Sequence, residues 1–141
     1  MKTSITDTVT PGVVAGDFTQ VDLHRAGATL LRVALGIMFI AHSVVLKYFT
    51  FTLAGTAQYF ASIGLPASLA YVVFALEAVD GVLLVLGIGT RWVALGLIPV
   101  LIGAAWVHVG NGWVFSAPNG GWEYPLFLIV VSLVVAAQAE K

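Results

Sequence analysis

Long apolar stretches alternate with short polar segments along the 141-residue chain. Four of them stand out by length, at residues 26–46, 66–88, 92–109 and 122–139. As a helix, the first stretch of about 21 residues crosses a hydrocarbon core of roughly 30 Å. None of the four shows the period-two alternation of membrane strands, so the pattern indicates helices. We therefore expect an all-α fold, a bundle of four transmembrane helices.

The segments outside these stretches have two different characters. Residues 50–65 mix polar and apolar positions at near-helical spacing and end on Gly64 and Pro66, which predicts a short interfacial helix between spans one and two. Residues 1–25 are more polar, and we expect a flexible N-terminal cytoplasmic tail there, followed by a membrane domain over residues 26–141. The first apolar stretch is too long for a signal peptide, so we expect it to be retained.

Composition supports the membrane assignment and excludes several functions. Only 9% of the residues are charged and 60% are hydrophobic, whereas soluble domains carry about 25% charged residues. The net charge of -1, without a cluster of Lys or Arg, argues against a nucleic-acid partner. The chain has no cysteine, so thiol chemistry is excluded, and any redox chemistry belongs to a bound cofactor or another subunit.

The positive charges around the apolar stretches predict the orientation in the membrane. Lys2, Arg25, Arg91 and Lys141 fall on one side of the bundle, and Lys47 falls on the other. By the positive-inside rule, both termini are expected in the cytoplasm, and the protein is expected to be a multi-pass protein of the cell inner membrane.

Three ionisable residues fall in one layer within the apolar stretches. Counting helix rise from the midpoint of each span places Arg32 and Asp80 slightly to the cytoplasmic side of Glu77. A charge at this depth costs about 2.5–3.5 kcal/mol, so we expect Arg32 to pair with Glu77 and Asp80. Two carboxylates against one guanidinium leave a surplus charge, so we expect Glu77 to hold a proton. The alternative is a structural latch without chemistry.

A second group of ionisable residues falls nearer the outer surface. His42, His108 and Glu123 lie at similar levels on three different spans. Such a group could bind a metal ion, hydrogen-bond a quinone carbonyl or relay protons. Structural roles compete with each reading, since Glu123 would neutralise a helix N-terminus and His108 would cap helix carbonyls.

Three motifs resemble those of the DoxX family of small bacterial membrane proteins. They are Leu31-Arg32-Val33-Ala34-Leu35-Gly36 continuing to His42 and Lys47; Gly64-Leu65-Pro66 followed by Glu77, Gly81, Leu84, Gly87, Thr90 and Arg91; and His108-x-x-Asn111-Gly112-Trp113 followed by Gly120-Gly121-Trp122-Glu123-Tyr124-Pro125. The third motif adds Asn111 and Tyr124 to His42, His108 and Glu123 as candidate cofactor-binding residues. The resemblance covers residues 27–137.

The resemblance implies a four-helix membrane fold and an association with redox biology. Related proteins look like membrane subunits of thiosulfate:quinone oxidoreductase, and others accompany sulfur-handling or detoxifying enzymes. The family usually has His-Gly followed closely by Lys, whereas here His42 precedes Ser43 and the lysine is Lys47. This departure puts a direct role for Lys47 in doubt.

The residues and the resemblance together leave three functional hypotheses. The first is a redox-associated subunit that binds a quinone near the outer leaflet, with Arg32, Glu77 and Asp80 handling the proton and a partner oxidoreductase supplying or receiving electrons. The second is a non-catalytic scaffold or assembly factor for such an enzyme. The third is a haem or metal site on His42 and His108.

Overall fold

The computed structural model describes residues 16–139, with side chains from residue 22 onward, and the regular secondary structure in this part of the chain is all helical. Five α-helices, one π-helix and a short 3₁₀ turn follow one another. Their bounds are α1 Gly16–Ile40, η1 Ala41–Thr50, α2 Leu53–Ser62, α3 Ala67–Leu86, α4 Thr90–His108, η2 Val109–Asn111 and α5 Glu123–Gln138. The all-α prediction and the short helix after the first span are confirmed.

Three helices are long and apolar enough to cross a membrane, namely residues Asp22–Thr50, Ala67–Leu86 and Thr90–Asn111. The fourth, α5, is apolar but has 16 residues, which gives a length of about 24 Å. That is short of a hydrocarbon core of roughly 30 Å, so the count of four spans remains a prediction.

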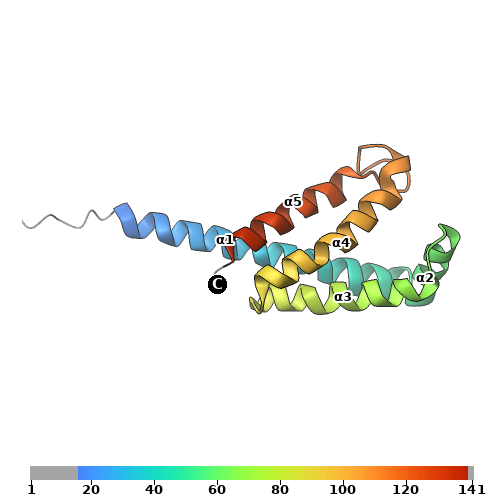
Figure 1. Ribbon diagram of the computed structural model, residues 1–141, viewed down its shortest axis with the longest axis horizontal. Coiled ribbons are helices and arrows are strands. Elements are labelled where there is room, and N and C mark those ends of the chain that lie inside the picture. Colours follow the sequence, from blue (N-terminus) through green and yellow to red (C-terminus); the bar gives the residue numbers. More distant parts are fainter. Residues whose placement is uncertain (1–15, 140–141) are drawn as a thin grey trace, which may run out of the picture.

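The first helix is longer than the sequence indicated. It begins at Gly16, ten residues before the start predicted at Ala26, and continues through η1 to Thr50. The N-terminal part of α1 extends beyond the other helices (Figure 1). The predicted tail therefore holds a helix over residues 16–25, and its first 15 residues lie outside the described part of the chain.

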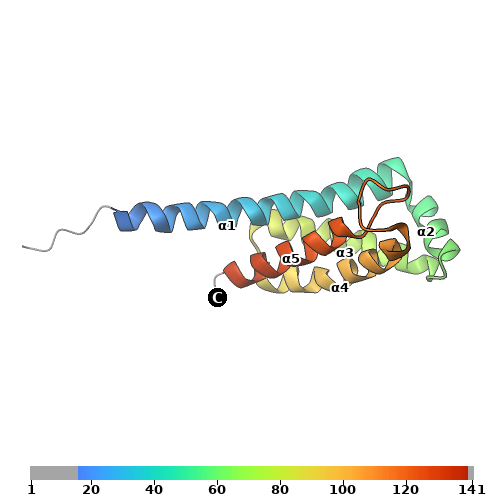
Figure 2. The ribbon, with the colours of Figure 1, turned by 90° about the horizontal axis from the view of Figure 1, so that it is seen from above.

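The bundle is built from two helix pairs, with α1 packed along α3 and α4 packed along α5. Figure 2 shows the α3–α4 turn and the end of α5 at one end of the bundle, and α2 with the α4–α5 loop at the other. The core joins both pairs through buried residues that include Leu35, Phe39, Leu84, Leu97 and Val135. Large side chains such as Ile37, Ile102 and Phe127 are more than half exposed. A bilayer accounts for this outward apolar surface.

Helix ends follow from local sequence. Thr52 precedes α2, and its Oγ1 accepts a hydrogen bond from the Gly55 N–H at 3.0 Å, which satisfies a free helix donor. At the C-terminal end of α3, Gly87 adopts a left-handed conformation with φ of 77°. The Ile88 N–H then donates to the Leu83 carbonyl at 2.9 Å, so α3 ends and the chain turns into α4.

Two glycines set the contact between α1 and α3. A Cβ added at Gly36 would lie 2.7 Å from the Gly81 carbonyl oxygen, and one added at Gly81 would lie 2.9 Å from the Gly36 carbonyl oxygen. The two backbones therefore approach as closely as small residues allow, a common device of membrane helix packing.

We predict that Gly36→Ala lowers the free energy of unfolding by about 1–3 kcal/mol, because the new methyl group meets backbone that cannot rotate away. Gly96→Ala is the matched control, since a Cβ there meets nothing within 4 Å and alanine favours a helix interior over glycine by about 1 kcal/mol. Reversible unfolding in mixed micelles measures both. Equal stabilities of the two variants would contradict the proposed contact.

Candidate functional site

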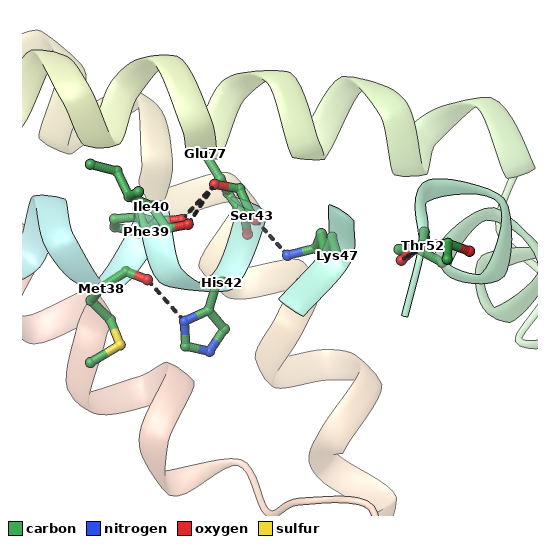
Figure 3. Close-up of polar contacts among 9 residues, drawn as sticks. Met38, Phe39, Ile40, His42, Ser43, Lys47, Thr52 and Glu77 are labelled. Carbon is green, nitrogen blue, oxygen red and sulfur yellow. Dashed lines mark hydrogen bonds and ion pairs between the residues drawn. The ribbon is translucent and has the colours of Figure 1, made fainter. Parts of the chain in front are cut away.

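A buried ion pair joins the first span to α3. The Lys47 Nζ on η1 donates to Glu77 Oε2 on α3 (Figure 3), and the two side chains are 16% and 8% exposed. Among the described residues this is the one ion pair. A lysine and a glutamate held together in a low-dielectric interior offset each other's desolvation, and removing one partner would leave the other charge uncompensated.

The register of α1 on α3 explains why Lys47, and not Arg32, reaches Glu77. With Gly36 opposite Gly81, the helices run antiparallel and Arg32 lies beside the end of α3. Helical side chains lean toward the N-terminus of their own helix. Lys47 and Glu77 therefore lean toward each other, whereas Arg32 leans away from Glu77.

The predicted pairing of Arg32 with Glu77 and Asp80 is therefore wrong. The Arg32 Nη1 donates to the carbonyl oxygens of Leu84 and Val85, the latter at 3.0 Å. These carbonyls belong to the last turn of α3, where the carbonyl oxygens run short of helical N–H donors and carry partial negative charge. A Cβ on Gly87 would lie 2.8 Å from the same Nη1, so the glycine leaves room for the guanidinium.

Asp80 has a different environment from Glu77. It is partly buried on α3, and it forms no ion pair and no side-chain hydrogen bond with any described residue. With Lys47 assigned to Glu77, the surplus carboxylate of this region is Asp80.

The π-helix carries three polar residues of the first span, His42, Ser43 and Lys47. Its wide turn is visible in the Phe51 N–H, which donates to the Leu46 carbonyl five residues back at 2.7 Å. The Ser43 hydroxyl, fully buried, lies 2.8 Å from the Phe39 carbonyl oxygen and donates to it. Helical segments with this i→i+5 pattern are rare in proteins, and those that occur often lie at functional sites. Nothing in the sequence indicated this geometry.

His42 is fixed by its own helix and by α5. Its Nδ1 lies 3.0 Å from the Met38 carbonyl oxygen (Figure 3). Since a carbonyl only accepts, Nδ1 carries a proton and donates it to this bond, which leaves Nε2 as the nitrogen that can exchange a proton. The ring stacks on Tyr124 of α5 with centroids 5.9 Å apart and an interplanar angle of 23°.

Tyr124 also lines a groove of about 450 Å³ at the start of α5. Its walls combine two polar residues with aromatic and aliphatic side chains, namely Trp113, Phe115, Glu123, Tyr124, Leu126, Phe127 and Val130. Small-molecule sites typically have this size and this mixture of apolar walls with a few polar groups. Phe127 and Val130 are at least half exposed, so the groove opens onto the apolar outer surface of α5.

The remaining candidates organise the loop between α4 and α5. The Asn111 side-chain amide donates to the Asn119 carbonyl at 3.0 Å and lies 3.5 Å from His108 Nδ1. The Glu123 Oε1 accepts from the Phe115 N–H at 2.9 Å. His108 and Asn111 thus hold the loop, whereas Glu123 both holds the loop and lines the groove.

The structure brings together only part of the predicted outer group. His42, Tyr124 and Glu123 lie in or directly behind the groove, and His108 with Asn111 contacts the loop. Within the described side chains, no three His, Asp or Glu residues are placed to hold a metal ion. Trp113 and Phe127 were not among the predicted site residues, although aromatic residues beside a helix start are a recognisable signal.

Helices with lipid-compatible exteriors and a buried ion pair define a small, multi-helix membrane protein. The sequence model of the DoxX family matches residues 27–110, which is more than half of the chain. The chain therefore belongs to the DoxX family.

The chain is also similar in sequence to a curated protein. The chain is 46% identical over 109 residues to "Putative oxidoreductase CatD" of Bacillus subtilis strain 168. The aligned region covers 77% of this chain and 78% of the relative. No solved structure gives a significant match to the chain.

We predict that Lys47→Met and Glu77→Gln each lower the free energy of unfolding by about 3 kcal/mol, since each leaves a buried charge without its partner. The double variant loses less than the sum of the two, and a double-mutant cycle measures this coupling. Asp80→Asn is the control on the same helix and is expected to cost less. Additive losses in the cycle would show that Lys47 and Glu77 do not interact.

Proposed function

We propose that this DoxX protein is a redox-associated membrane subunit that binds a quinone, or a similar small carbonyl-bearing redox partner, in the groove at the start of α5. The observation that carries the proposal is the stack of His42 on Tyr124, the residue that lines this groove. The name of the Bacillus subtilis relative supports an oxidoreductase setting.

The groove offers a quinone a hydrogen-bond donor and apolar walls. The Tyr124 hydroxyl forms no hydrogen bond with a described residue, so it is available to donate to a carbonyl oxygen. Trp113 and Phe127 provide flat apolar walls, and the exposed face of α5 gives a route from the lipid. A quinone enters from the hydrocarbon phase, so a groove open to lipid is the expected arrangement.

The protons and electrons have separate sources in this proposal. Reduction of a quinone to a quinol takes two electrons and two protons. A partner oxidoreductase supplies the electrons, and His42 relays protons through Nε2 toward Tyr124. Asp80 is the carboxyl that we propose to hold a proton deeper in the bundle. Arg32, bound to the α3 carbonyls, and Glu77, paired with Lys47, have structural roles.

The membrane placement belongs to the same proposal. Arg25 and Arg91 lie at the end of the bundle where α5 finishes, and Lys47 lies toward the other end. We propose that the first end is cytoplasmic, that α5 forms the fourth span and that the protein resides in the inner membrane. The groove then lies near the outer leaflet.

We predict that Tyr124→Phe weakens binding of ubiquinone-1 about tenfold, because a hydrogen bond to the quinone contributes about 1–1.5 kcal/mol. Quenching of tryptophan fluorescence follows binding, since Trp113 lines the groove. Tyr59→Phe is the matched control, because Tyr59 is an exposed residue of α2 that does not line the groove. Equal affinities of wild type and Tyr124→Phe, or no binding to either, would refute the proposal.

A scaffold or assembly role is the second candidate function, and the exposed loop between α4 and α5 favours it. Trp113, Val114 and Phe115 are all at least half exposed at one end of the bundle, a common feature of partner-binding surfaces. For this role, Phe115→Ser would reduce recovery of a partner oxidoreductase in native co-purification while Tyr124→Phe would not. Full recovery with Phe115→Ser would exclude the loop as the contact.

A further inference from the structure

A second and larger groove lies at the end of the bundle opposite the candidate quinone site. It has a volume of about 1040 Å³ and is formed where α1 extends past the α3–α4 turn and the end of α5. In Figure 2 the N-terminal part of α1 runs past the end of α5 and past the α3–α4 turn. Its lining includes most of the described basic residues, namely His24, Arg25, Arg32 and Arg91.

The three arginines of this groove keep hydrogen-bond donors in excess. Arg32 uses Nη1 for the α3 carbonyls, and Arg91 uses Nη2 for the Ala139 carbonyl at 3.1 Å. Arg25 is exposed and donates to no described residue. A guanidinium carries five N–H groups, and no described carboxylate lies within ion-pair distance of any of the three. The groove thus presents concentrated positive charge and open donors.

One wall of the groove is apolar and exposed. Leu86 is 64% exposed and Trp92 is 76% exposed, and both line the groove beside the arginines. Trp is typical of the level at which lipid headgroups meet acyl chains. A ligand that covers both walls has an anionic head and an apolar tail.

We propose that this groove binds the phosphate-bearing headgroup of an anionic phospholipid. Arginine binds phosphate oxygens through paired N–H groups, and basic pockets between membrane helices accept anionic headgroups. Inorganic phosphate shares this chemistry, but it would fill a small part of 1040 Å³ and would leave the Leu86 and Trp92 wall uncovered. The structure therefore favours the lipid. This site is independent of the proposed quinone site.

Native mass spectrometry of the full chain, exchanged into mixed phosphatidylglycerol and phosphatidylcholine, tests the proposal. Wild type is expected to retain phosphatidylglycerol selectively. Arg25→Gln with Arg91→Gln should weaken that retention about tenfold to thirtyfold, because each basic residue contributes about a factor of five. Arg25→Lys with Arg91→Lys is the matched control, which keeps the charge and should keep most of the selectivity.

Two results would overturn the proposal. One is equal phosphatidylglycerol retention by wild type and the double glutamine variant, with both folded by circular dichroism. The other is full displacement of the lipid by millimolar inorganic phosphate, which would show that the groove takes a free anion instead. Retention that survives phosphate and falls in the glutamine variant supports the lipid assignment, whatever the outcome of quinone binding.

Discussion

The structure depends on one constraint, that charged side chains surrounded by apolar helices need partners inside the protein. The Lys47–Glu77 pair meets this need where the first span meets α3, and Arg32 meets it by binding the carbonyl end of α3. Both contacts join the same two helices. The close approach at Gly36 and Gly81 sets the register that permits them. Helix packing and charge placement are therefore a single arrangement in this DoxX protein.

The two ends of the bundle differ in chemistry because of how α1 changes along its length. Near Lys47 the helix becomes a π-helix, and in this segment Lys47 contacts Glu77 of α3 and His42 stacks on Tyr124 of α5. At the other end it remains an α-helix and runs past the bundle, and there it carries Arg25 into a basic groove. An aromatic groove and a basic groove thus lie at opposite ends of one helix, which matches the proposed division between redox partner and lipid headgroup.

Apolar patterning was sufficient to predict the all-α architecture, because the length of each stretch reports the environment directly. The contact partner of each charged side chain was not predictable in the same way. Levels counted from span midpoints placed Arg32 with Glu77, but the contact depends on where Gly36 meets Gly81 and on the direction in which side chains lean. His42 and Tyr124 were named together as candidate residues, but their ring stacking and the π-helix that begins beside His42 had no signature in the sequence. His108 and Asn111 were placed at the correct end, yet the loop binds them instead of the groove.

The most direct test is to measure the distance between the Lys47 side-chain nitrogen and the Glu77 carboxyl carbon by solid-state NMR in lipid bilayers. With ¹⁵N on lysine side chains and ¹³C on glutamate carboxyls, the account predicts strong dipolar coupling that is lost in Lys47→Met. With ¹⁵N on arginine side chains, it predicts no such coupling to the Glu77 carboxyl. Coupling from arginine to Glu77, or none from Lys47, would contradict the register on which the structure rests.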